Sequence, residues 1–326
     1  MSVSIRSLLT RRKSYRALRS WLLAALRTFW RSLDRKACVR RSQVRRHVDL
    51  PSGMPRARRQ RGSVWGITTV RDEADIIGAC LRHQFAQGID AIIIADNGSV
   101  DGTRRIVQEL ADHYPIYLVS DHLVPFYQAE KMSNLARLAR LAGADWVLPF
   151  DADEFWFADG ESVGNYLRHA HDFDIVVATI HDMVPNSDQE QSVDSNSAFI
   201  INRQPGPFYK VAFRSHRWAF IGDGNHSVIR PGKLGTGLRL AHLPVRSLAQ
   251  FTRKARQGAD ALIQAGGDAN VGGHWLAWSA LTDDELRDQW IKLRSTPAYS
   301  GHDRPSAERH KVLRWSSWQF PSDEQL

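Results

Sequence analysis

Cysteine is scarce in this sequence of 326 residues, which contains only Cys38 and Cys80. Two cysteines cannot form the disulfide framework of a small secreted domain, nor a metal site built from paired cysteines. The basic N-terminal part also lacks a long apolar run. Its longest one covers residues 21–26, far fewer than the roughly 20 residues that cross a bilayer. We therefore expect a cytoplasmic protein that is neither secreted nor membrane-spanning.

Acidic residues are nearly absent from residues 1–62, which hold 18 Lys and Arg but only 2 Asp, a net charge of +16. The whole chain carries +9, so the remaining residues carry −7. Leu18, Leu22, Leu26 and Phe29 recur at helical spacing among arginines, which predicts a basic amphipathic helix. Two interpretations stay open: attachment to an anionic membrane surface through residues 1–61, peripheral on the inner face of the membrane, or a solvated extension.

A linker rich in arginine, proline and glycine ends this segment, and a domain begins near Ser63. From there, apolar β-branched runs alternate with segments of helical periodicity. This alternation predicts an α/β fold in which helices cover a parallel sheet. The predicted strands are 64–70, 91–95, 116–119 and 146–150, and the predicted helices are 76–87, 103–113 and 130–142.

Three parts are expected along the chain. Residues 1–62 are a basic, partly helical extension and linker, residues 63–265 the main domain, and residues 266–326 a helical C-terminal region packed on it. Ser247 is a plausible N-cap, because serine oxygens accept hydrogen bonds from the first turn of a helix. The later predicted elements are strands at 174–180, 199–202 and 210–213 and a helix at 247–264.

An Asp-Ala-Asp-Glu segment, residues 151–154, directly follows the predicted strand 146–150, at the sheet edge where open α/β sheets bind ligands. Residues two apart on an extended chain face the same side, so Asp151 and Asp153 can converge, with Glu154 directed elsewhere. Two carboxylates this close need a cation between them, and oxygen ligands select Mn²⁺ or Mg²⁺. Such an ion stabilises charge on a departing diphosphate. Alone, the triplet is weak evidence, since short acidic motifs often lie in solvated turns.

A second polar segment, residues 96–103, follows the predicted strand 91–95 and opens the next helix. Its two glycines and small polar residues suit a tight strand-to-helix turn. A helix N-terminus at this place favours an anion or a nucleotide nearby. An ordinary turn with an N-cap is the alternative interpretation.

Three motifs, at residues 69–75, 93–103 and 150–154, together resemble family 2 glycosyltransferases with a GT-A fold, in both order and spacing. The resemblance covers roughly residues 63–260 and is closest to a bacterial branch with a later His-x-Pro-x-Arg-Ser segment, here residues 242–247. It implies a Rossmann-like, mostly parallel sheet flanked by helices. It also implies a transferase that uses a nucleotide-activated sugar.

The resemblance implies a role for each acidic residue of the three motifs. Asp96 would contact the nucleotide base, and Glu73 and Asp101 would lie beside the nucleotide. Asp151 and Asp153 would reach the ribose, the diphosphate and the metal. A later Glu-Asp pair, which supplies the catalytic base in many inverting relatives, is not evident in this sequence.

The resemblance implies binding roles for three further residues. Similar enzymes often complete the cation site with a downstream histidine, so His242 is a candidate metal ligand, and a core or surface histidine is the alternative. Polar residues near the donor in resembling enzymes point to Lys131. Arg71 of the first motif is counted among the donor-binding residues.

Four residues are singled out by their position in the chain. Arg246 and Lys254 lie near and along the predicted helix 247–264, where positive charge could neutralise a diphosphate leaving group, although a solvated helix face is the alternative. Asp223 and His226 lie in a polar, glycine-rich loop, and such loops often line acceptor sites. Either one could deprotonate an acceptor hydroxyl, whereas a structural turn is the competing interpretation.

The sequence therefore predicts a metal-dependent glycosyltransferase that moves a sugar from a nucleoside-diphosphate sugar, with a UDP-sugar favoured, to a hydroxyl of a glycan or lipid-linked acceptor. Synthesis of a surface polysaccharide or glycolipid is the expected setting. A nucleotidyltransferase or other phosphate-processing enzyme could also use paired aspartates and a divalent ion. A protein that binds nucleic acid through its arginines is the other alternative, although no recognisable module accompanies the charge, so no specific nucleic acid is expected.

Overall fold

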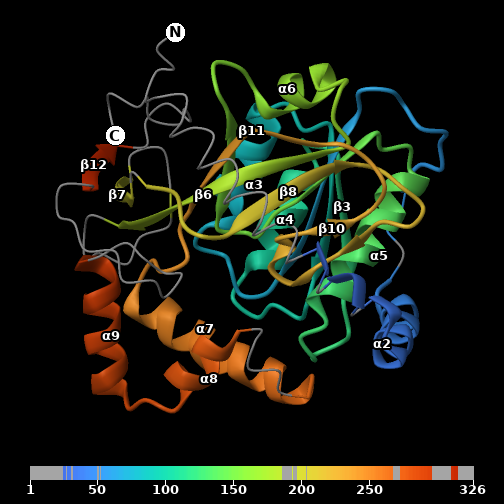
Figure 1. Ribbon diagram of the computed structural model, residues 1–326. Coiled ribbons are helices and arrows are strands. Elements are labelled where there is room, and N and C mark those ends of the chain that lie inside the picture. The colour runs from blue at the N-terminus through green and yellow to red at the C-terminus, as the bar shows by residue number, and fades with distance from the viewer. Residues whose placement is uncertain are drawn as a thin grey trace, which may run out of the picture.

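The computed structural model describes residues 25–26, 28–30, 32–49, 51, 53–185, 193, 197–202, 204–266, 272–295 and 310–314. Within this part of the chain, a mixed sheet forms the centre and helices cover both of its faces (Figure 1). A short second sheet pairs β9 (Phe220–Ile221) with β10 (Val228–Ile229). The strands of the main sheet are β1 (Val64–Val70), β2 (Ala91–Asp96), β3 (Ile116–Ser120), β4 (Trp146–Pro149), β5 (Glu154–Ala158), β6 (Ile175–Pro185), β7 (Ala198–Asn202), β8 (Tyr209–Arg214), β11 (Leu234–His242) and β12 (His310–Arg314).

The helices lie where the predicted periodicity placed most of them, with ends shifted by one or two residues. Ser247 does cap its helix, because its side chain accepts a hydrogen bond from the backbone N–H of Gln250. The helices are α2 (Arg35–His47), α3 (Ile77–Ala86), α4 (Thr103–Ala111), α5 (Gln128–Leu141), α6 (Val163–His169), α7 (Leu248–Gln264), α8 (Gly273–Ser279) and α9 (Asp283–Ser295), with a short 3-10 helix, η1 (Asp223–Asn225).

The parallel arrangement predicted for the first four strands is confirmed. β1 pairs in parallel with both β2 and β4, and β2 pairs in parallel with β3. All six residues of β2 are buried, as expected for a strand with helices on both faces. The α/β fold predicted from the sequence is thereby confirmed, and the carboxyl ends of these strands meet at one edge of the sheet.

The second half of the sheet combines both strand directions. β8 runs antiparallel to β4 and β6, and β6 runs parallel to β11. β11 in turn pairs antiparallel with β5, placing His242 opposite Glu154. This pairing brings a residue 88 positions downstream next to the Asp-Ala-Asp-Glu segment.

Two strands next to the candidate site were not predicted. β5 begins at Glu154, so the acidic segment joins two strands rather than entering a loop. β11 contains Gly235 and Gly237, and its register with β6 shifts between Thr236 and Leu238. Such a bulge interrupts the alternation of apolar residues on which strand prediction depends.

Two layers of apolar side chains hold the helices on the sheet. Ile92 and Ile94 of β2 face α3 and α4, whereas Ile93 faces α5. Neighbouring residues of a strand point to opposite faces, so the run of isoleucines serves both layers.

Both ends of the chain contribute helices. α2 packs on α5 through the buried Val44, and α9 packs on α7 through Leu286 and Leu293. Of the predicted amphipathic helix, the residues before Ala25 lie outside the described part of the chain. None of the described helices is both long enough and apolar enough to cross a membrane.

Candidate active site

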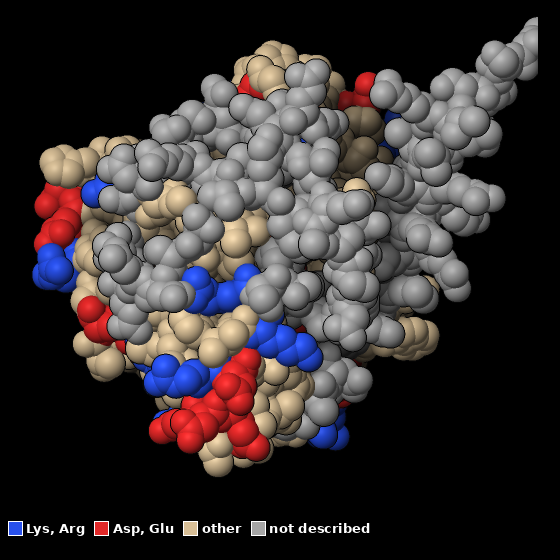
Figure 2. Space-filling model, turned by 90° about the vertical axis from the view of Figure 1, so that its left-hand side faces the viewer, with Lys and Arg blue, Asp and Glu red and all other residues tan. Residues whose placement is uncertain are grey.

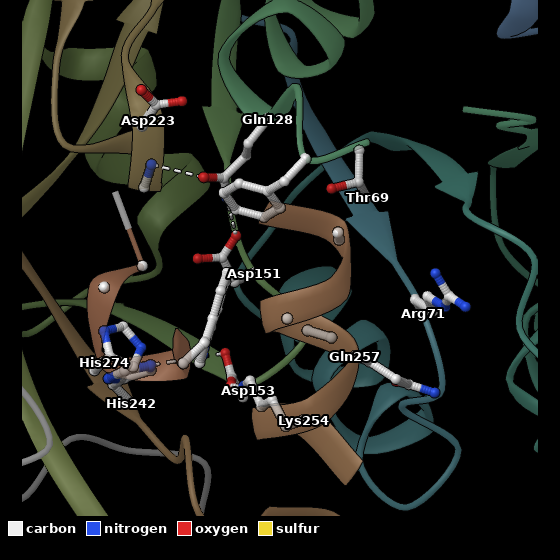
Figure 3. A pocket seen from close by; sticks show the side chains of 18 of the residues that line it. Thr69, Arg71, Gln128, Asp151, Asp153, Asp223, His242, Lys254, Gln257 and His274 are labelled. Carbon is white, nitrogen blue, oxygen red and sulfur yellow. Dashed lines mark hydrogen bonds and ion pairs between the residues drawn. The ribbon is translucent and has the colours of Figure 1, made fainter. Parts of the chain in front are cut away.

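A cavity of about 1090 Å³ opens at the carboxyl edge of the parallel strands. Its walls come from the end of β1, the start of α5, the turn after β4, the end of β11, and helices α7 and α8. Residues 222–227, between β9 and β10, also contribute, and we call them the η1 loop. In the view of Figure 3, Asp151 lies near the centre, with Thr69 and Arg71 on one side and His242 and His274 on the other. Segments far apart in the sequence thus share one pocket.

Asp151 is held firmly from several directions. Its Oδ2 atom lies 2.6 Å from Lys210 Nζ, and its Oδ1 atom accepts a hydrogen bond of 3.1 Å from Asn225 Nδ2. Lys210 also pairs at 2.6 Å with Glu154, which is fully buried behind the turn. Burial raises the pKa of Glu154 to about 7, against the lowering effect of the Lys210 charge. Lys210 therefore pairs with two carboxyl groups at once.

Asp153 has a separate positive partner. Its Oδ2 atom accepts a hydrogen bond of 2.6 Å from Lys254 Nζ on α7. Burial alone would raise the pKa of Asp153, but the charges of Lys254, His242 and Arg246 hold it well below the usual range. The two carboxylates were expected to need a cation between them, and in the structure each has its own lysine.

His242 points at Asp153 from the end of β11. Its Nδ1 atom donates a hydrogen bond of 2.8 Å to Asp182 Oδ1, so the ring nitrogen that faces Asp153 Oδ1, at 3.8 Å, is Nε2. Burial lowers the pKa of His242, but the hydrogen bond to Asp182 and the charge of Asp153 outweigh burial and raise it. A carboxylate that orients a histidine in this way is the usual support of a metal-binding imidazole.

The metal prediction can be tested against these atoms. Among the described residues, no group of three or more His, Cys, Asp or Glu side chains is arranged to hold a metal ion. Asp153 Oδ1 and His242 Nε2 nevertheless form an oxygen and nitrogen pair 3.8 Å apart, and both residues line the cavity. Mg²⁺ and Mn²⁺ commonly take few protein ligands and fill the rest of their coordination with water and phosphate oxygens. The residues present fit such a cation.

Arg246 is buried beside this pair. It lies between β11 and α7 and joins that segment to the β1–α3 loop. Its guanidinium bonds to Glu73 and Asp75 of the β1–α3 loop, the latter at 2.6 Å through Nε. It also lies 3.9 Å from Asp153. Burial raises the pKa of Glu73, although Arg246 and Lys254 act to lower it. Arg246 thus fixes acidic side chains and does not point a free charge into the cavity.

The η1 loop carries the two candidate bases. Both Asp223 and His226 line the cavity. His226 Nδ1 donates a 2.7 Å hydrogen bond to the carbonyl of Tyr209, and the ring stacks on Phe208. Burial, assisted by the charge of Lys210, lowers the pKa of His226 to about 4. The imidazole is therefore neutral at neutral pH with one unprotonated ring nitrogen, and it is a weaker base than an ordinary histidine.

A family model described as glycosyl transferase family 2 matches residues 67–230, half of the chain. The chain belongs to this family. It is therefore a glycosyltransferase, as the sequence motifs predicted.

Similar solved structures cover various parts of the chain. The crystal structure of S. aureus TarS 1-349 in complex with UDP is 11% identical, covers 73% of this chain and 73% of its own, and has a TM-score of 0.37. Glucosyl-3-phosphoglycerate synthase from Mycobacterium tuberculosis, in complex with Mn²⁺, UDP and glucosyl-3-phosphoglycerate, is 18% identical, covers 36% of this chain and 44% of its own, and has a TM-score of 0.27. A search of curated proteins found no match.

Several donor-site candidates of this glycosyltransferase are engaged in structural contacts. Asp96 accepts hydrogen bonds from Ser99 N and Arg104, and Asp101 accepts from Thr103 and Ala74 N. Neither aspartate is among the residues that line the cavity. Asp96 instead holds the turn after β2 in shape, and Asp101 joins this turn to the β1–α3 loop through Ala74 N.

Two basic candidates do line the cavity. Lys131 lies on α5, where its ammonium group contacts Asp121 and the carbonyl of Leu123, each at 2.6 Å. Burial lowers the pKa of Lys131, partly opposed by Asp121. Arg71 lies at the end of β1, and its buried Nε atom has no hydrogen-bond partner in the described part of the chain. Arg71 is the better placed of the two to bind a ligand.

Four residues of the site were not singled out from the sequence. Lys210 and Asn225 contact Asp151, and Asp182 contacts His242. Gln128 holds the η1 loop, with its Oε1 accepting from Gly224 N at 2.7 Å. A lysine within the otherwise apolar strand 209–213 was the one visible signal, because a buried charge requires a partner. The other three belong to segments whose neighbours only the fold determines.

Proposed function

We propose that this glycosyltransferase transfers a sugar from a nucleoside-diphosphate sugar to a hydroxyl group, with the donor diphosphate bound between Asp153, His242 and Lys254. The proposal is carried by the convergence of these three side chains in one cavity at the carboxyl edge of parallel strands. Residues 63–265 would form the transferase domain, with residues 1–62 and 266–326 as flanking parts. UDP-sugars are the donors to test first.

The leaving diphosphate gathers negative charge as the bond to the sugar breaks. Lys254 Nζ lies 2.6 Å from Asp153 and can turn from that carboxylate to the phosphate, which stabilises the charge. A Mn²⁺ or Mg²⁺ ion bound by Asp153 and His242 would supply further Lewis-acid stabilisation of the same charge. Asp151, fixed by Lys210 and Asn225, would orient the donor.

The acceptor hydroxyl needs a base on the opposite side of the sugar. We assign this role to the η1 loop, where His226 is the stronger candidate because its Nδ1 already donates to Tyr209 and its Nε2 is the proton-accepting nitrogen. Asp223 is the second candidate. The acceptor would be a glycan or a lipid-linked glycan of the cell surface, since a cavity of about 1090 Å³ has room beyond the donor.

The test is release of nucleoside diphosphate from a panel of nucleotide sugars, with Mn²⁺, Mg²⁺ or EDTA present. We expect one donor to be turned over selectively and only with a divalent ion. Asp153→Asn should lower the rate by roughly 100-fold, since loss of one preorganised group at the developing charge has this size of effect. The exposed Asp112→Asn is the matched control. Turnover that is equal in Asp153→Asn and the parent protein would refute the assignment.

A further inference from the structure

Large apolar side chains are exposed close together at the start of the described chain. Leu26, Phe29, Trp30 and Leu33 lie within eight residues, and Trp30 is 69% exposed and Leu33 61% exposed. We call these four residues the apolar N-terminal face. Exposed apolar residues are ordinary when scattered, but a group of them marks a surface that binds something.

Exposed positive charge follows this face along the chain. The next helix, α2, has no acidic residue, and its Arg35, Lys36, Arg45 and Arg46 are exposed. Helix α9 is different, because it begins with Asp283-Asp284-Glu285 and has basic residues in its last turn. Figure 2 shows both signs of charge side by side on that face. Of these two helices, only α2 has charge of a single sign within its bounds, with Asp34 as its N-cap.

The same segment touches the loop that carries the candidate bases. Thr28 Oγ1 lies 2.7 Å from Ser227 Oγ in a buried hydrogen bond. Gly222 packs so closely against Thr28 that a Cβ atom at position 222 would lie 2.4 Å from Thr28 Oγ1. Arg41 also lies over the ring of Phe220, 5.4 Å from its centre. The N-terminal segment is therefore a neighbour of the η1 loop, and not a detached tail.

A second set of contacts joins the segment to residues next to α7 and α5. Arg40 donates a 3.1 Å hydrogen bond to the carbonyl of Ala265, directly after α7, and its guanidinium lies over the ring of Tyr127, which lines the cavity. The N-terminal segment is thus also anchored beside the end of α7 and the start of α5.

We propose that the apolar N-terminal face and the basic residues of α2 dock on an anionic lipid bilayer, and that docking presents the η1 loop to an acceptor carried by that bilayer. Apolar side chains enter the acyl boundary while the arginines and lysine attract lipid phosphates. Nucleic acid explains the charge but not the aromatic and leucine side chains turned to solvent. The acceptor part of this inference rests on the proposed transferase activity.

The test uses the full-length protein and sedimentation with vesicles of phosphatidylcholine alone or mixed with phosphatidylglycerol. We expect binding only to the anionic vesicles, reduced roughly tenfold or more in the double variant Phe29→Ser, Trp30→Ser, since two large apolar side chains no longer enter the bilayer. Ile291→Ser, which removes an apolar residue that is 51% exposed on α9, is the matched control and should bind like the parent.

Binding and activity are read separately. Hydrolysis of a soluble donor without vesicles should be equal in the parent and the double variant, whereas transfer to a vesicle-borne acceptor should fall with binding. No sedimentation of the parent protein, equal sedimentation of the double variant, or preferential binding to duplex DNA would overturn the docking inference. A parent protein that sediments but turns over no donor would instead refute the proposed function.

Discussion

Lys210 shows how a single residue organises the site. It is buried on β8, with its ammonium group 2.6 Å from both Asp151 and Glu154. Burial disfavours its charge, but the two carboxylates outweigh this effect and raise the pKa of Lys210 above its usual value. Removing one partner from such a group leaves the others charged in a poorly solvated place. The lysine is thus a structural requirement of the acidic turn.

Substitution of Lys210 by methionine should lower the free energy of unfolding by about 3 kcal/mol, because Glu154 loses its countercharge. Urea unfolding measures the effect. The exposed Lys233→Met should change the free energy by no more than about 0.5 kcal/mol. Adding Glu154→Gln to Lys210→Met should recover part of the loss. Equal losses in the two lysine variants would contradict this account.

His83 determines part of the pH dependence of stability. It is buried on α3 with Nε2 2.7 Å from the carbonyl of Trp156, and burial lowers its pKa to about 4. In the unfolded chain His83 binds a proton as the pH falls through about 6.5, whereas in the folded chain it does so only near pH 4. The free energy of unfolding is therefore highest above pH 6.5 and decreases as the pH falls toward 4.

Between pH 7 and pH 5, this one histidine should cost about 2 kcal/mol of unfolding free energy. Urea unfolding of His83→Gln at both values should show a pH dependence smaller by about that amount, since glutamine does not titrate. A pH dependence unchanged from that of the parent protein would show that His83 titrates normally.

At the scale of elements, α2 is more than a charged extension. Asp34 caps it by accepting a hydrogen bond from Lys36 N, and Ala37 and Val44 turn inward. Val44 joins the apolar layer beneath α5, whereas Val39 on the same helix is 55% exposed. The helix therefore has one face in the core and one face toward solvent.

Val44→Ala should lower the free energy of unfolding by about 2 kcal/mol, because it leaves a gap in a packed layer. Val39→Ala makes the same chemical change at an exposed position and should cost little. Thermal unfolding of both variants provides the comparison. If the two midpoints agree, α2 is not part of the folded core.

At the scale of the whole molecule, the cavity joins parts that the chain order separates. Its walls include the parallel strands, the antiparallel half of the sheet and helices α7 and α8. Arg253 and Gln257 of α7 also bond to Asp72 after β1, at 3.1 and 2.7 Å. A donor bound in this cavity, as proposed, would contact all of these parts at once.

UDP with Mn²⁺ should accordingly raise the midpoint of one cooperative thermal transition. The expected stabilisation is about 2.7 kcal/mol at a ligand concentration of about 100 times Kd. Asp153→Asn should abolish the shift, and Asp112→Asn should retain it. Two separate transitions, only one of them moved by ligand, would show that the parts unfold independently.

The local elements were largely determined by the sequence. Apolar runs such as 91–95 and the cap at Ser247 act over a few residues, and the structure confirms the predicted strands and helices. The motifs around residues 69–75, 93–103 and 150–154 were sufficient to indicate the family, which the family model confirms. The position of Asp151 and Asp153 at the strand edge also followed from chain order alone.

The partners of those aspartates were decided by the tertiary structure. Lys210 and Lys254 reach Asp151 and Asp153 from segments 59 and 101 residues away, and Asp182 supports His242 across the β6–β11 pairing. The glycine-interrupted β11 could not be predicted from periodicity, although it carries His242 into the site. The sequence alone shows where the carboxylates are. Which ammonium group pairs with each of them depends on the distant strand and helix that pack beside it.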